Sequence, residues 1–174
     1  MTARLRAEHG FGLVELLIAM LIMNVALLTI LGAFTAGATA VRQASRVSTA
    51  ATLADAQMEL YRALTYSAIA LDPSTIPTTT PYTSDTSYSA TQITATCSGA
   101  VSTHNDCNAS RTLTGPDHGS YEIDTYIVTY NSSNGGPTNG RDGKLVTVVV
   151  RDASNLTATP FAREQTSFDA STGQ

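Results

Sequence analysis

The chain has 174 residues, of which 14% are charged, and its formal net charge at pH 7 is −4. This length allows one modest domain beside a membrane anchor. Because 10 Lys and Arg residues are outnumbered by 14 Asp and Glu residues, the composition argues against the broad basic surface of a general nucleic-acid-binding protein.

A short basic head followed by a long apolar run begins the chain. Arg4 and Arg6 precede the run, which extends from Phe11 to Phe34 and contains one charged residue, Glu15. About 24 residues at 1.5 Å each give about 36 Å, enough to cross a hydrocarbon core of about 30 Å. The run is longer than the apolar core of an ordinary secretory signal. The basic head predicts a cytoplasmic N-terminus, with the rest of the chain carried across the membrane.

Two details distinguish this run from a plain single-pass anchor, which is the alternative interpretation. A carboxylate within a membrane span costs a few kcal/mol on insertion scales, so Glu15 is a functional candidate by default. The second detail is the Gly10-Phe11 junction that opens the run. The sequence GFGLVELLIAM resembles the signal of type IV prepilins, the precursors of type IV pilins and of type II secretion pseudopilins. The resemblance ends near Thr35.

The resemblance implies that the chain matures on the cytoplasmic face of the membrane. A prepilin peptidase would cut between Gly10 and Phe11 and methylate the new amine of Phe11. Glycine has no side chain, so a protease can approach the backbone closely there. In the family, the carboxylate at the position of Glu15 pairs with the N-terminal amine of a neighbouring subunit. A catalytic role for Glu15 is the rival interpretation, and the sequence offers it no partner residue.

A helical pattern continues past the apolar run. Between Val47 and Ala68 the apolar residues gather on one half of the helical projection, which predicts an amphipathic helix lying on a sheet. These apolar residues are Val47, Ala50, Leu53, Ala54, Met58, Leu60, Tyr61 and Leu64. Asp72-Pro73 should end the helix, because the residue before proline avoids the α region. The predicted helix therefore spans 11–71, with 11–34 as its transmembrane and polymerisation part.

Gly32 and Gly37 lie inside this predicted helix, and two explanations for them stay open. Each glycine costs about 1 kcal/mol against alanine in a helix interior, which would loosen the helix locally. Alternatively, Gly32, Ala33, Ala36 and Gly37 would allow close approach of another helix.

Residues 72–90 are rich in Ser, Thr and Pro and poor in large aliphatic residues. They predict a surface loop, most simply a solvated connector. Because the segment is long for a loop in a compact domain, contacts with neighbouring subunits are a second interpretation, and O-glycosylation is a third.

Cys97 and Cys107 are the two cysteines of the chain. In an exported protein they predict a disulfide, which would contribute roughly 3 kcal/mol in the chain-entropy model. A metal site with His104 and Asp106 is the alternative, with too few ligands at tight spacing. His118, beside Asp117, is expected on the surface. No arrangement with a catalytic signature is recognisable, so we predict neither enzyme activity nor a cofactor.

In the C-terminal part of the chain, residues alternate between two faces with the period of two that is typical of β-strands. Strands are predicted at Tyr121–Tyr130 and Leu145–Val150, paired as an antiparallel hairpin, and further strands around Gln92–Cys97 and Pro160–Phe168. The Gly/Asn-rich loop between the hairpin strands is interpreted as a plain turn, because its spacing matches no EF-hand. A calcium site using Asn139 and Asp142 is the alternative. The tail 169–174 is expected to be flexible.

Together these features predict an α+β fold: a leader at 1–10, a long helix at 11–71, a loop at 72–90 and an antiparallel sheet domain at 91–168. The predicted function is a structural subunit of a type IV pilus-like filament, most like a minor pilin or minor pseudopilin. The implied partners are sibling subunits, prepilin peptidase, the inner-membrane assembly platform and, before assembly, lipid. The implied location is the inner membrane, then a cell-surface or periplasm-spanning filament. A pseudopilin of a secretion or DNA-uptake machine and an anchored binding protein remain alternatives.

Overall fold

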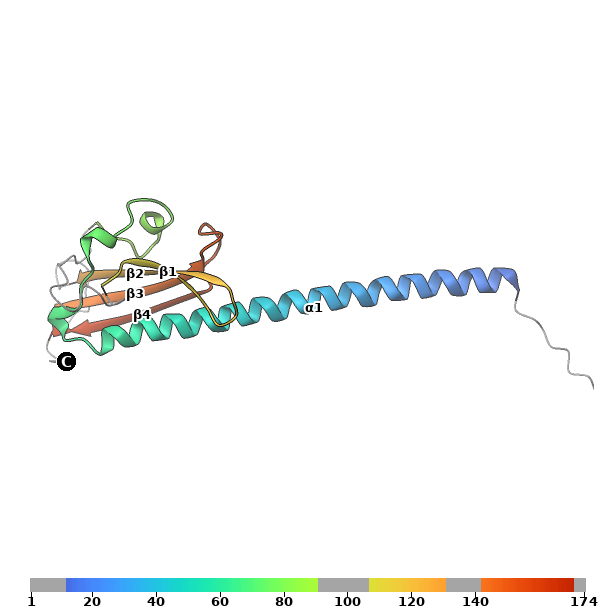
Figure 1. Cartoon of the computed structure of the whole chain (residues 1–174), viewed down its shortest axis with the longest axis horizontal. Helices are drawn as coiled ribbons and strands as arrows, with labels where there is room; N and C mark the ends of the chain where they lie inside the picture. The colour runs from blue at the N-terminus through green and yellow to red at the C-terminus, as the bar shows by residue number, and fades with distance from the viewer. Residues whose placement is uncertain (1–11, 91–106, 131–141, 171–174) are drawn as a thin grey trace, which may run out of the picture. The chain divides into compact units, whose positions relative to one another are not determined.

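The computed structural model describes residues 12–90, 107–130 and 142–170. These residues form one long helix, three 3₁₀ turns and four strands (Figure 1). In chain order they are α1 (Leu13–Arg62), η1 (Tyr66–Ala68), η2 (Pro73–Thr75), η3 (Tyr82–Ser84), β1 (Ser110–Thr114), β2 (Ser120–Tyr130), β3 (Gly143–Asp152) and β4 (Ala162–Asp169). The chain divides after Gln43 into two units, which are described in turn.

The described part of the first unit consists of the N-terminal part of α1. The α-helix runs without a break through Gly32 and Gly37, so neither glycine interrupts it. By length and composition, α1 is the one helix of the described residues that could cross a membrane. This agrees with the apolar run that the sequence predicts as a span.

The second unit is built on an antiparallel sheet in the strand order β1-β2-β3-β4. Each strand pairs with the next one along the chain, and the pairing of β2 with β3 runs from Tyr121↔Asp152 to Tyr130↔Gly143. The predicted hairpin is therefore confirmed, as is a strand in the region of Pro160–Phe168. The sequence did not predict β1, and the strand predicted at Gln92–Cys97 lies outside the described residues.

The second half of α1 covers one face of this sheet. Ala50, Ala54, Met58 and Tyr61 are each 0% exposed, and they pack with alternate residues of β2 and β3. Those sheet residues are Ile123, Ile127, Val146, Val148 and Val150. The predicted apolar face was too wide, because Val47 and Leu60 keep 40% and 39% of their surface exposed. The polar Gln57, in contrast, is buried at 1%.

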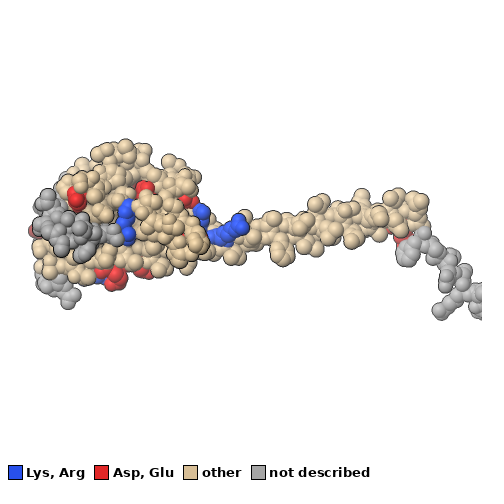
Figure 2. Space-filling view, viewed as in Figure 1, with Lys and Arg blue, Asp and Glu red and all other residues tan. Residues whose placement is uncertain are grey.

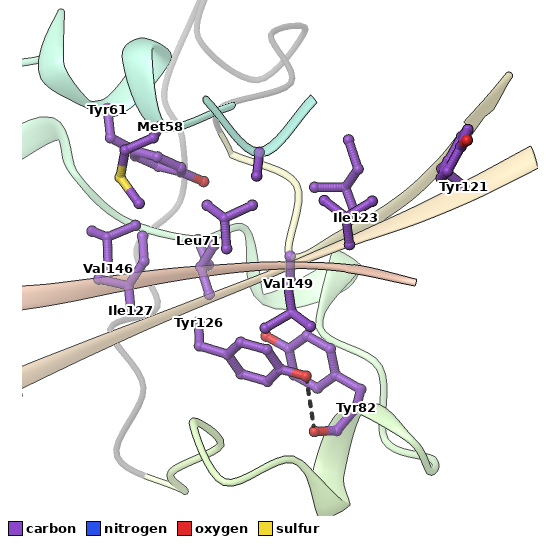
Figure 3. Packing of buried hydrophobic residues seen from close by; sticks show 14 of the residues in the cluster. Met58, Tyr61, Leu71, Tyr82, Tyr121, Ile123, Tyr126, Ile127, Val146 and Val149 are labelled. Carbon is purple, nitrogen blue, oxygen red and sulfur yellow. Dashed lines mark hydrogen bonds between the residues drawn. The ribbon is translucent and has the colours of Figure 1, made fainter. Parts of the chain in front are cut away.

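The opposite face of the sheet is covered by residues 72–90, which we call the strap. Tyr82 of η3 is 1% exposed, and its ring stacks on Tyr126 of β2 at a centroid distance of 4.4 Å (Figure 3). The Tyr82 hydroxyl donates a hydrogen bond to the Thr125 carbonyl at 2.7 Å. A solvated connector is therefore the wrong description of this segment. Because both faces of β2 carry large side chains, the face opposite α1 must also be shielded from water, and the strap provides that cover.

The helix ends earlier than predicted, at Arg62 rather than near residue 71. The chain then turns so that Ile69 and Leu71 enter the core, each 0% exposed. Lys144 of β3 holds this turn, since its ammonium donates to the carbonyls of Tyr66 and Ile69 at 2.7 Å each. Asp72-Pro73 follows the turn and was not needed to end the helix.

Candidate functional site

The N-terminal part of α1 presents apolar side chains in every direction. Leu13 and Phe34 are each 77% exposed and Val41 is 70% exposed. Monomeric soluble proteins rarely expose a continuous apolar surface of this extent. Since burying one such side chain is worth about 1.5–3 kcal/mol, lipid or other apolar helices are the environment that this surface requires.

Polar side chains within this part of α1 are turned back onto their own helix. The Asn24 amide donates to the Met20 carbonyl at 2.9 Å, and the Thr29 hydroxyl donates to the Val25 carbonyl at 2.8 Å. The Thr35 and Thr39 hydroxyls make the same kind of bond, to the carbonyls of Gly32 and Ala36. A membrane-spanning helix must satisfy its polar groups internally. The arrangement leaves Glu15 as the exception.

Glu15 lies in the first turn of α1 with its side chain exposed. Its backbone N–H donates to the Gly12 carbonyl at 3.0 Å, and a carboxylate is favoured at this end of a helix. Within residues 12–43 the one basic residue is Arg42, about 40 Å away along the helix at 1.5 Å per residue. Within residues 12–43, therefore, no basic side chain lies near the Glu15 carboxylate.

A shallow apolar hollow lies near the far end of this surface. It is lined by the small residues Ala33, Gly37 and Ala38 and by the larger side chains of Ile30, Phe34 and Val41. A Cβ added at Gly37 would meet no other atom within 4 Å. Small residues that leave such a hollow allow another helix to approach closely. Arg42 also lines the hollow, and Figure 2 shows basic side chains at this end of the otherwise uncharged stretch of α1.

Residues 5–38 match the family model described as the prokaryotic N-terminal methylation motif. The chain carries a prepilin-type signal. The match covers the start of α1, including Glu15, and is consistent with a type IV pilin or pseudopilin. The motif overlaps the helix that is long and apolar enough to anchor the chain in a membrane. Neither a curated protein nor a solved structure gives a significant match to the chain.

The two residues at the prepilin cleavage position, Gly10 and Phe11, lie outside the described residues, and Glu15 follows them in the first turn of α1. Glu15 lies at the start of the exposed apolar surface of α1. The processing roles of Gly10 and Phe11 and the assembly role of Glu15 stay predictions.

Other candidate residues belong to the second unit. Cys107 is buried at 2% exposure, while its predicted disulfide partner, Cys97, lies outside the described residues, as do His104, Asp106 and Asn139. The disulfide and the calcium site are thus untested predictions. No three His, Cys, Asp or Glu residues of the described ranges are grouped as metal ligands would be.

A buried polar cluster beneath the strap was missed by the sequence analysis. Arg151 of β3 bonds Asp85 of the strap and also donates to Asp124 of β2 at 3.3 Å. Arg163 of β4 donates to Asp85 at 2.8 Å. Burial acts to raise the pKa of Asp85, but the hydrogen bonds from Arg163 and Ser87 and the charge of Arg163 outweigh it and hold the pKa low.

A cavity of about 410 Å³ opens beside this cluster, between the strap and the β3–β4 connection. Asp85, Arg151 and Arg163 line it together with hydroxyl and small apolar side chains. The charged groups are already bonded to one another, so the cluster holds the strap on the sheet. No local sequence signal could have found it, because its members come from distant parts of the chain.

Proposed function

We propose that this protein is a structural subunit of a type IV pilus-type filament. The observation that carries the proposal is the coincidence of the methylation motif at residues 5–38 with an exposed apolar helix. This helix starts with a lone carboxylate, at Glu15, and the one basic residue within residues 12–43, Arg42, lies about 40 Å away along the helix. Its surface would be covered by lipid before assembly and by the helices of sibling subunits afterwards.

Processing would create the missing cation. Water cleaves the Gly10–Phe11 peptide bond in a prepilin peptidase, which leaves a free amine on Phe11. A sulfonium donor then transfers a methyl group to the amine nitrogen and leaves as a neutral thioether, while the amine releases one proton to water. The methylated amine is protonated at neutral pH and carries one positive charge. This amine is the cation that pairs with Glu15 of a neighbouring subunit, because opposite charges that meet away from water remove the cost of leaving either one alone.

The expected membrane topology of the chain determines where assembly begins. The N-terminus stays in the cytoplasm, because Arg4 and Arg6 precede the span. The sheet domain lies on the outer face of the inner membrane until an assembly platform extracts the subunit into the filament. The partners of the chain are therefore sibling subunits, the peptidase and the platform.

The mass of the N-terminal peptide tests this proposal in the native host. We expect a chain that starts at Phe11 and carries one added methyl group. The Gly10→Val variant should accumulate uncut in the membrane, since a β-branched side chain crowds the scissile bond. Wild-type protein that retains Met1 would contradict the proposal and would favour a membrane-anchored binding protein.

A further inference from the structure

The two flanks of α1 in the second unit differ in charge. On one flank, Arg111 of β1 lies opposite Ile123 in the sheet register, so it lies on the same sheet face as the helix. Its guanidinium Nη2 donates to the Gln57 side-chain oxygen at 2.9 Å. The neighbouring Nε is buried without a hydrogen-bond partner. Burial lowers the pKa of Arg111, yet the described residues supply it with no carboxylate.

The opposite flank carries excess negative charge. Glu164 of β4 lies opposite Val148, again on the helix side of the sheet, and there it meets Asp55 and Glu59 of α1. Burial, a hydrogen bond with Asp55 and the charges of Asp55 and Glu59 raise the pKa of Glu164. Arg62 is the one basic residue acting on this group, and it already pairs with Glu59 at 2.5 Å.

These two groups cannot neutralise each other within one chain. Gln57 and Asp55 are two positions apart, about 200° around the helix axis, so they lie on opposite sides of α1. Likewise β1 and β4 are the two outer strands of the described sheet. Arg111 and the acidic flank (Asp55, Glu59 and Glu164) therefore face away from each other. Figure 2 shows charged side chains confined almost entirely to the second unit.

A chain with two different complementary flanks is suited to head-to-tail assembly. Such heterologous contacts, repeated, build an open helical filament rather than a closed dimer. We propose that Arg111 of one copy binds the acidic flank (Asp55, Glu59 and Glu164) of the next copy. This proposal rests on the filament function proposed above and adds the surface through which the second units meet.

Charge reversal with rescue tests the contact. Arg111→Glu and Glu164→Arg should each lower, several-fold, the ratio of protein in sheared filaments to protein in membranes. The double variant, which exchanges the two charges, should restore most of that ratio. Thr114→Glu and Ser167→Arg are matched controls, because each puts the same charge on the same strand but on the opposite sheet face, where both residues are exposed.

Cysteine cross-linking identifies the partner even if charge reversal disturbs folding. In sheared filaments, Arg111→Cys combined with Glu164→Cys should give a ladder of multimers of this chain on a non-reducing gel. The Thr112→Cys, Gln165→Cys pair should give none. Filaments without the ladder, or a cross-link to a different protein only, would overturn this contact while leaving the filament function intact. Absence of the wild-type chain from filaments would instead overturn the filament function itself.

Discussion

Asp85 and Arg151 form an ion pair in which both side chains are buried, at 3% and 6% exposure. The pair joins the strap to β3 across 66 positions of sequence. Arg163 adds a more exposed contact to the same carboxylate at 2.8 Å. One carboxylate therefore connects a polar loop to two neighbouring strands.

Loss of the Asp85 charge should strongly destabilise the second unit. Asp85→Asn leaves the buried Arg151 without its main partner, and breaking a buried pair in this way costs about 3–5 kcal/mol. We expect this loss in the free energy of unfolding, measured by urea titration of the full chain in detergent. Asp72→Asn, which removes an exposed carboxylate of the same strap, should have a small effect. Equal effects of the two variants would contradict the proposed role of the pair.

The same pair makes a pH prediction. The folded pKa of Asp85 lies below its ordinary value of 3.8. Its contribution to stability is therefore complete above the unfolded pKa and is lost as the pH falls through the lower, folded value. In urea titrations below about pH 4, wild-type protein should lose more stability than Asp85→Asn does. Parallel curves for the two proteins would count against the shift.

The contact between α1 and the sheet should respond to Met58 and hardly to Leu60. Met58 is 0% exposed, whereas Leu60 is 39% exposed. Met58→Ala leaves a cavity in the core and should cost about 2–5 kcal/mol of the free energy of unfolding. Leu60→Ala changes a largely solvated position and should cost less than about 1 kcal/mol. Urea denaturation followed by circular dichroism measures both, and a larger loss for Leu60→Ala would contradict the observed helix face.

The Tyr121 hydroxyl should ionise at a higher pH than the hydroxyl of an ordinary tyrosine. Burial and a hydrogen bond to Asp117 raise its pKa from 10.0 to about 12. Because the unfolded chain ionises at lower pH than the folded one, this residue's stabilisation is lost as the pH rises from about 10 to about 12. Tyr121→Phe should therefore show a shallower fall in stability over that range than wild-type protein. Identical slopes would indicate that Tyr121 is not shielded.

Glu15 should act in assembly and not in insertion. Glu15→Ala removes a charge that is costly within a membrane, so insertion should stay intact or improve. The ratio of protein in sheared filaments to protein in membranes should fall, because the amine of the neighbouring subunit loses its partner. Glu15→Asp, which keeps the charge, is the matched variant and should retain part of that ratio. An unchanged ratio for Glu15→Ala would remove the central support of the assembly mechanism.

Cys97 and Cys107 should be bridged in protein exported by its own host. Intact-mass measurement without reductant should give a chain two hydrogens lighter than the reduced one. The bridge would close a short loop and contribute roughly 3 kcal/mol. Free thiols in freshly exported protein would contradict the pairing and reopen the metal interpretation with His104 and Asp106.

Local pattern in the sequence was enough for the membrane segment and for the central strands. The apolar run predicts α1, and Glu15 stands out as the single carboxylate within that run. Both features depend only on residues close together in the chain. The β2–β3 hairpin follows from alternation and β-branched residues for the same reason. In this hairpin Gly143 lies opposite Tyr130, and a Cβ on Gly143 would collide with the Tyr130 ring, a cross-strand contact that the composition of the loop does not reveal.

What only the tertiary structure decided concerns residues that are distant in sequence. The sequence analysis placed Leu60 and Met58 together on the apolar face, but residues two positions apart lie about 200° from each other around the helix axis. The face of α1 that packs on the sheet therefore buries Met58 and leaves Leu60 39% exposed. The composition of the strap predicts a solvated loop. Tyr82 and Asp85 are nevertheless buried, because they contact Tyr126 and Arg151 on the sheet face that α1 does not cover. Arg111 and Glu164 became opposite flanks only when the strand order set β1 and β4 at the two edges. A sequence pattern records the preference of each segment for burial, whereas the partner that satisfies this preference is chosen by packing.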